Sequence, residues 1–156
     1  MNYEQSINYI HSIPKFRRPL GNANLEKLLT PLDNPQKKLK FIHIAGTNGK
    51  GSTAAMTAEI LKKSGFKTGL FTSPYLEVFN ERIRINGENI TDNDLAEYVT
   101  RVKTIMEENN ALVSEFAFIT AVSFLYFYEK QCDIVVLEVG MGGKLDATSV
   151  IDSSLV

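Results

Sequence analysis

The sequence predicts an α/β fold: a P-loop-type, mainly parallel sheet with helices on both faces. Two apolar runs support this prediction, because segments 41–44 and 134–137 contain almost no polar residues, as is typical of strands covered on both sides. The first run leads into a glycine-rich segment and then into a helical pattern. Strands that alternate with helices favour parallel pairing, with helices above and below the sheet.

The first forty residues predict two short helices, from Tyr3 to Ile13 and from Asn24 to Leu29. Prolines at positions 14, 19, 31 and 35 punctuate the connections, because proline lacks an N–H donor and interrupts helices. The basic run 37–40 is expected to be solvated surface that leads into the strand at Phe41.

The glycine-rich segment opens a helix that is expected to extend from Lys50 to Lys63. It should stop at Ser64-Gly65, because glycine adopts the left-handed conformation that ends helices. A second strand is predicted over residues 66–71.

A hairpin is predicted next, because residues 82–85 alternate polar and apolar and Asn86-Gly87 favours a tight turn before residues 88–90. The alternation places Arg82 and Arg84 on one face. There they are either exposed or available to anionic substrate groups.

Two helices and a third core strand complete the pattern. Thr91 with Asp94 resembles a capping box that opens a helix to about Glu108, and an apolar helix follows over residues 115–130. The aromatic residues of that helix predict core packing rather than base stacking, because no cations are interleaved with them. The third core strand covers 134–138, and residues 153–156 resemble the start of another strand.

Segment 46–53 has the features of a phosphate-binding loop. Its glycines let the backbone approach an anion, Lys50 supplies a point charge for the outer phosphates, and Ser52 or Thr53 offers a hydroxyl. The common P-loop pattern differs, since it has Ser or Thr where Gly51 stands and glycine where Ile44 stands; a chance glycine-rich turn is the alternative. We expect this segment to bind ATP, with Lys50 as the catalytic group. The residues expected to bind ATP are Thr47, Asn48, Gly49, Lys50, Gly51, Ser52 and Thr53. His43, inside the strand, is expected to be a core residue.

A phosphate-binding loop needs a magnesium ligand, usually an acid at the tip of a neighbouring strand. Glu138 stands where the run 134–137 gives way to glycines, so it is the first candidate; a solvated acid is the alternative. Ser73 is the second candidate, because Pro74 restricts its conformation, although local sequence alone favours an ordinary turn serine.

Four motifs together resemble the folylpolyglutamate synthase and dihydrofolate synthase family, within the Mur ligase superfamily. They occur in the family's order, the similarity covers nearly the whole chain from Leu25, and the motifs lie at 46–52, 72–74, 80–87 and 137–148. The resemblance implies a Mur-ligase-like ATP-binding domain of an ATP- and Mg²⁺-dependent ligase. Such a ligase adds L-glutamate to dihydropteroate, a reduced folate or both, through an acyl-phosphate intermediate.

Carried over by motif, residues 49–52 hold the phosphates, while Ser73 and Glu138 hold magnesium. Segment 75–84 resembles the family's loop near the pterin substrate. The candidate substrate-binding residues are Tyr75, Arg82, Ser114, Glu115, Phe116, Ala117 and Asp146.

The chain departs from the family pattern at three places. Tyr75 stands where the family often has His. Lys144 stands where the family often has Arg, and lysine keeps the charge but cannot form the paired hydrogen bonds of a guanidinium. Ala117 stands where Glu usually follows Phe, with Glu115 close by in sequence. The substrate contacts near these positions are therefore the least constrained by the resemblance.

In the family a downstream histidine, a lysine and a C-terminal domain that helps bind nucleotide and glutamate complete the site. We therefore expect residues 1–156 to be an incomplete N-terminal ATP-binding domain without the C-terminal glutamate-ligase domain. Such a fragment should bind nucleotide weakly at best and not turn over. The full-length protein is expected to be a monomer.

Composition excludes several other classes. Seventeen basic and eighteen acidic residues leave a net charge of -1, which gives no electrostatic case for nucleic acid or membrane partners. Cys132 is the single cysteine, so no internal disulfide is possible, and no apolar run resembles a signal peptide or a membrane span. We expect a cytoplasmic enzyme. The alternatives are another P-loop small-molecule kinase, a peptidoglycan Mur ligase or a non-catalytic binding module.

Overall fold

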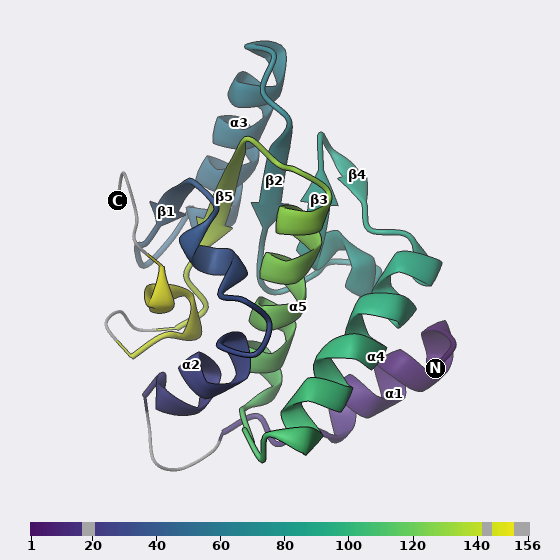
Figure 1. Ribbon diagram of the computed structural model, residues 1–156. Coiled ribbons are helices and arrows are strands. Elements are labelled where there is room, and N and C mark those ends of the chain that lie inside the picture. Colours follow the sequence, from purple (N-terminus) through teal and green to yellow (C-terminus); the bar gives the residue numbers. More distant parts are fainter. Residues whose placement is uncertain (17–20, 142–144, 152–156) are drawn as a thin grey trace.

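A mixed sheet lies at the centre of the fold (Figure 1). The computed structural model describes residues 1–16, 21–141 and 145–151, and within them the sheet has five strands in the order β1-β5-β2-β3-β4. The strands are β1 (Phe41–Ile44), β2 (Thr68–Phe71), β3 (Ile83–Ile85), β4 (Glu88–Asn89) and β5 (Ile134–Glu138).

The three predicted core strands pair in parallel, with β5 between β1 and β2. The predicted hairpin is also present: β3 pairs antiparallel with β2, and β4 with β3. The sheet is therefore parallel at its centre and antiparallel at one edge. The strand predicted at 153–156 lies outside the described residues.

The predicted start of β2 at Phe66 was wrong, since the strand begins at Thr68. The reason is the end of the preceding helix. Gly65 has a φ of +92°, its N–H donates to the Lys62 carbonyl at 3.0 Å, and the Phe66 N–H donates to the Leu61 carbonyl at 3.1 Å. These two bonds form a Schellman motif, so Phe66 belongs to the turn that ends the helix.

The helices are close to those expected. Three of them are one residue shorter because the prediction had included a cap, and α2 begins one residue earlier than predicted, at Ala23. They are α1 (Tyr3–Ser12), α2 (Ala23–Leu29), α3 (Lys50–Lys63), α4 (Asp92–Glu108) and α5 (Glu115–Glu129), together with short 3₁₀ turns η1 (Pro35–Lys37), η2 (Phe79–Arg82) and η3 (Ala147–Val150). The Thr91 hydroxyl accepts from the Asp94 N–H at 3.1 Å, which confirms the cap predicted for α4. Within the described residues, no helix is long and apolar enough to cross a membrane.

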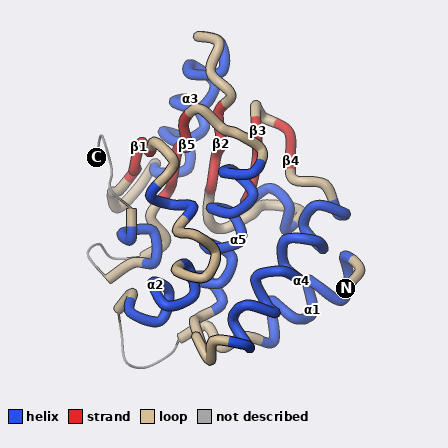
Figure 2. Tube along the Cα trace, in the orientation of Figure 1, coloured by secondary structure: helices blue, strands red, loops and turns tan. Residues whose placement is uncertain are grey.

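Helices cover both faces of the sheet, as predicted (Figures 1 and 2). On one face α3 packs through Ala54 against Leu70 and Val136. On the other face α5 lies between the sheet and the helices α1, α2 and α4, and its residues 117–127 are all buried. A helix that is apolar on every side suits this central position. The aromatic cluster of α5 forms core as expected, except that Tyr128 is exposed.

Gly69 in β2 is held in tight contact with α5 and β5. A Cβ at this position would lie 2.9 Å from Cδ1 of Phe127 and 3.1 Å from Cγ2 of Val135. Because the Phe127 side chain is fully buried, it has little room to move. Gly69→Ala is therefore expected to lower the free energy of unfolding by about 1–3 kcal/mol, measured by urea titration. Gly51→Ala is the matched control, since its Cβ would meet Glu138 at an ordinary 3.6 Å; an equal loss in both variants would contradict the steric explanation.

Cys132 packs in the main core, with 9% of its surface exposed. Burial raises the pKa of its thiol from the ordinary 9.0 to about 11. The thiolate is the reactive form, so a thiol reagent at pH 7.5 should modify the folded chain about a hundredfold more slowly than the urea-unfolded chain. Equal rates, followed by absorbance of the released chromophore, would show that the thiol is accessible.

Candidate functional site

The phosphate-binding segment lies between the end of β1 and the start of α3, as the sequence predicts. Residues 45–49 are exposed, and Gly49 precedes the helix with a φ of +76°, which favours glycine. The first hydrogen bond of the helix is present, because the Thr53 N–H donates to the Gly49 carbonyl at 2.9 Å. The first N–H groups of α3 have no partner within the helix, and together with its dipole they make this end suitable for an anion.

Glu138 reaches the first turn of α3 from the neighbouring strand. It stands opposite Ile44 in the β1–β5 register, and only 4% of its surface is exposed. A Cβ on Gly51 would lie 3.6 and 3.7 Å from the two carboxylate oxygens, so the carboxylate packs directly against the helix. Its Oε2 accepts a hydrogen bond from the Ser73 N–H at 2.9 Å. The loop, Glu138 and Ser73 are therefore close together in space.

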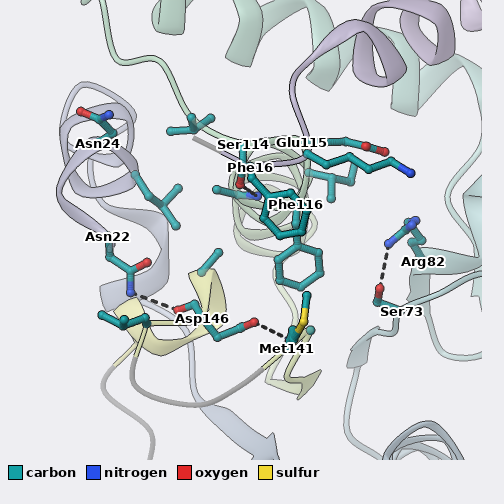
Figure 3. A pocket seen from close by; sticks show the side chains of 18 of the residues that line it. Phe16, Asn22, Asn24, Ser73, Arg82, Ser114, Glu115, Phe116, Met141 and Asp146 are labelled. Carbon is teal, nitrogen blue, oxygen red and sulfur yellow. Dashed lines mark hydrogen bonds between the residues drawn. The ribbon is translucent and has the colours of Figure 1, made fainter. Parts of the chain in front are cut away.

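The Ser73 side chain makes a different contact from its main chain. Its hydroxyl accepts from Nη1 of Arg82 at 3.1 Å (Figure 3). Ser73 thus touches Glu138 through its N–H and Arg82 through its Oγ. The two predicted metal ligands adjoin each other, but the hydroxyl of Ser73 is engaged with a cation.

The fit to a divalent cation depends on Glu138. Among the described residues there is no group of three or more His, Cys, Asp or Glu side chains that could hold a metal. Magnesium, however, is commonly bound by one or two carboxylates with waters and substrate phosphates. No described residue donates a hydrogen bond to Oε1 of Glu138, so this oxygen suits that role. A carboxylate beside a phosphate site also repels phosphate unless a cation lies between them.

A cavity of about 980 Å³ is lined by Ser73 but by no residue of the segment 46–53 (Figure 3). Its wall is formed by the end of α1, the start of α2, the segment 73–82, the start of α5 and the segment after β5. All seven predicted substrate-binding residues line it: Tyr75, Arg82, Ser114, Glu115, Phe116, Ala117 and Asp146.

The prediction that Arg82 and Arg84 share one face was wrong. Arg84 lines a separate cavity of about 200 Å³ beside α3, and its Nη2 donates to the Thr72 hydroxyl at 3.2 Å. Arg82 belongs to η2, and β3 begins only at Ile83, so strand alternation does not extend to it. Lys144 lies outside the described residues, as do Gly142 and Gly143.

Arg82 is one of the charged residues that line the cavity. Its guanidinium carbon lies 5.2 Å from the ring centre of Tyr75 and 5.3 Å from that of Phe79. Burial lowers the pKa of Arg82, while the nearby charge of Glu115 opposes that shift. Its Nε is buried and has no partner among the described residues. The guanidinium lines the cavity and offers a positive charge to an anionic ligand there.

The segment after Pro74 is ordered by Glu81. The carboxylate of Glu81 accepts hydrogen bonds from the N–H groups of Leu76, Glu77 and Val78, at 2.7 to 3.1 Å. These bonds, that from Leu76 above all, lower the pKa of Glu81. The segment is thereby fixed beside the cavity, and the Leu76 side chain remains 90% exposed.

Gly140 makes room for Phe116 at the wall. A Cβ at this position would lie 2.5 Å from Cζ of the Phe116 ring, so only glycine allows the ring its observed place. The ring in turn packs against Phe71, with ring centres 5.8 Å apart.

Sequence reasoning missed the cavity residues that come from the N-terminal helices and from the segment after β5. They include His11, Lys15, Phe16, Asn22, Asn24, Met141 and Leu145. His11 lies 3.4 Å from the Glu115 carboxylate, and several of the others form an exposed apolar rim. No local pattern distinguishes them from ordinary surface residues, because the fold alone brings them to the wall.

Known proteins with similar sequences and structures identify the family. No protein-family model matches the chain. The folylpolyglutamate synthase of Lacticaseibacillus casei is 43% identical over 156 residues, covering 97% of this chain and 36% of that protein. The dihydrofolate synthase/folylpolyglutamate synthase of Bacillus subtilis is 39% identical over 158 residues, covering 98% of this chain and 37% of that protein.

A solved structure described as an FPGS-AMPPCP-folate complex has a TM-score of 0.93 and 42% identity, covering 98% of this chain and 38% of that one. The chain therefore spans a little over a third of the length of these three relatives. None of these relatives is a small-molecule kinase or a peptidoglycan ligase. Over the part of the family's length that it spans, this chain belongs to the folylpolyglutamate synthase and dihydrofolate synthase family.

Proposed function

We propose that this chain is the ATP-binding part of a ligase that joins L-glutamate to dihydropteroate, a reduced folate or both. The relatives are named for these reactions, and one related structure holds AMPPCP and folate. The observation that carries the proposal is the position of Glu138, packed against the first turn of α3 and bonded to Ser73 at the edge of the large cavity. This arrangement suits a triphosphate on one side and a second substrate on the other.

The residues around the phosphate-binding segment would act by positioning the ATP phosphates and offsetting their negative charge. In the proposed reaction an oxygen of the folate carboxylate attacks the γ-phosphorus of ATP, ADP leaves, and an acyl phosphate forms. The amine of glutamate then attacks the acyl carbon and releases phosphate, which gives the amide. Lys50 and the N–H groups of α3 hold the phosphates in line and offset their negative charge. Magnesium held by Glu138 would supply further positive charge at the phosphates, and the Ser73 hydroxyl is the second candidate ligand.

The cavity side would hold the pteroate. Phe116 and the exposed side chains of Phe16, Met141 and Leu145 offer an apolar surface for a flat heteroaromatic ring. Arg82 offers a half-buried cation for a carboxylate. A ligand with an aromatic head and an anionic tail matches both features.

The glutamate step requires more of the protein than these residues. Because the chain spans just over a third of its relatives, we propose that residues outside 1–156 bind glutamate and complete the nucleotide site. The chain alone should then bind nucleotide weakly and form no product.

Isothermal titration and a product assay together test the proposal. The 156-residue chain should bind AMPPCP in the presence of Mg²⁺ and bind tetrahydrofolate or dihydropteroate in the large cavity. With ATP and labelled glutamate it should yield no labelled folate. Absence of both binding signals would refute the assignment, and labelled product from this chain alone would contradict the proposed need for further residues. Comparison of the two pteroates shows which the cavity prefers.

A further inference from the structure

A buried polar network connects β1 with the wall of the large cavity. His43 in β1 is 8% exposed, Thr148 is fully buried and Asp146 is 6% exposed. Nε2 of His43 lies 2.8 Å from the Thr148 hydroxyl, which donates to Oδ1 of Asp146. Buried polar groups are costly without partners, and a chain of such bonds specifies one arrangement of the elements it joins.

The carboxylate of Asp146 is directed at its own chain. Oδ1 accepts from the Thr148 N–H at 2.9 Å as well as from the hydroxyl, and Oδ2 accepts from the Met141 N–H at 2.8 Å (Figure 3). The Asp146 carbonyl accepts from the side chain of Asn22 at 3.0 Å. Both Met141 and Asn22 line the cavity. Asp146 therefore shapes the wall instead of offering a free carboxylate to a ligand.

The direction of the hydrogen bonds follows from the single proton of the Thr148 hydroxyl. That proton is donated to the carboxylate of Asp146, so the hydroxyl faces His43 with a lone pair. Nε2 of His43 must then carry a proton. Burial lowers the pKa of His43, with the charge of Asp146 acting in the opposite direction, which favours the neutral Nε2–H tautomer.

We propose that His43 is a positioning residue that acts through Thr148 on Asp146 and fixes the Met141 and Asn22 side of the cavity relative to the phosphate-binding loop. His43 precedes this loop by a few residues and pairs in register with Leu137, the neighbour of Glu138. One hydrogen-bond network thus connects the cavity wall to the strand that leads into the phosphate-binding loop, next to the strand that carries Glu138. The effect on ligand binding rests on the proposed function, whereas the network itself does not.

Nuclear magnetic resonance of the ¹⁵N-labelled chain tests the network without any ligand. The chain has two histidines, His11 and His43, so their ring signals can be assigned by substitution of His11. His43 should show the Nε2–H tautomer in the wild-type chain, a result that needs no variant of the network to fold. An Nδ1–H tautomer would overturn the inference.

Amide exchange of Met141 measures the effect at the wall. Thr148→Val and His43→Leu should each speed this exchange by about tenfold, because the carboxylate that accepts the Met141 N–H loses its orientation. Thr148→Ser and His43→Gln keep a hydroxyl and an N–H donor and should preserve slow exchange. Thr68→Val is the matched control, since Thr68 is 1% exposed and its hydroxyl donates to the Phe66 carbonyl, at the end of β2 far from Ser73. Unchanged Met141 exchange in both disrupting variants would overturn the proposal.

Tetrahydrofolate and AMPPCP, used as separate probes, extend the test to binding. Thr148→Val should weaken tetrahydrofolate binding by about tenfold and change AMPPCP affinity less than twofold, while Thr148→Ser should bind both ligands as the wild-type chain does. Equal loss of both ligands would point to general destabilisation and overturn the positioning role. If the wild-type chain binds neither probe, the proposed function fails, and the tautomer and exchange results decide the network alone.

Discussion

Lys50→Ala is expected to lower the affinity of the chain for Mg²⁺-ATP by about ten- to a hundredfold. Lys50 is the first residue of α3, directly after the left-handed Gly49, and is the cation contributed by the phosphate-binding segment. A hydrogen bond to a charged partner is worth about 1.5–3 kcal/mol, which corresponds to this range. Titration with AMPPCP measures the change directly.

Lys63→Ala provides the matched control for this substitution. Lys63 lies at the other end of the same helix, its side chain is 77% exposed, and its removal changes the net charge equally. Its loss should change the affinity less than twofold. Circular dichroism should show the same helix content in both variants. If the two substitutions weaken binding equally, the effect is one of overall charge and Lys50 has no special place at the phosphates.

Glu138→Gln is expected to change nucleotide affinity in opposite directions with and without magnesium. The buried carboxylate lies against the first turn of α3, so without a metal it repels the phosphates. Two unit charges about 4 Å apart interact by about 4 kcal/mol at an effective dielectric constant near 20, so an effect of about tenfold in each direction is a modest expectation. Glutamine keeps the volume and the acceptor for the Ser73 N–H.

Two titrations of each variant, one with Mg²⁺ and one with a chelator, test this sign reversal. The variant should bind AMPPCP more weakly than wild type with the metal and more tightly without it. Glu59→Gln is the control, because it removes a half-exposed carboxylate farther along α3. It should change the AMPPCP affinity only slightly, with or without Mg²⁺. A uniform fall under both conditions would remove Glu138 from the proposed metal site.

The elements were predictable where the signal is local. The bounds of α3 and β5 match the prediction because a glycine, a continuous apolar run or a helix-ending turn marks each boundary. The start of β2 was not predictable, because the turn that ends α3 extends to Phe66, whose N–H donates to the Leu61 carbonyl. The antiparallel edge of the sheet followed from the Asn86-Gly87 turn.

The site was predictable to the extent that motifs carry it. The resemblance named seven residues that the fold brings to one cavity, although their contacts with a substrate stay a prediction. The apolar rim and the role of Asp146 were not predictable, because both depend on segments that are distant in sequence. His43 and Thr148 are separated by 105 positions, and no local pattern relates a strand histidine to that hydroxyl.

Ser73 has a consequence for the timing of the proposed reaction. A single residue reaches the carboxylate beside the phosphate segment with its main chain and the guanidinium at the cavity with its side chain. This one residue therefore stands between the proposed nucleotide side and the cavity. An acyl phosphate made beside Ser73 would form next to the cavity proposed to hold the pteroate, so no transfer of the substrate would separate its binding from its activation.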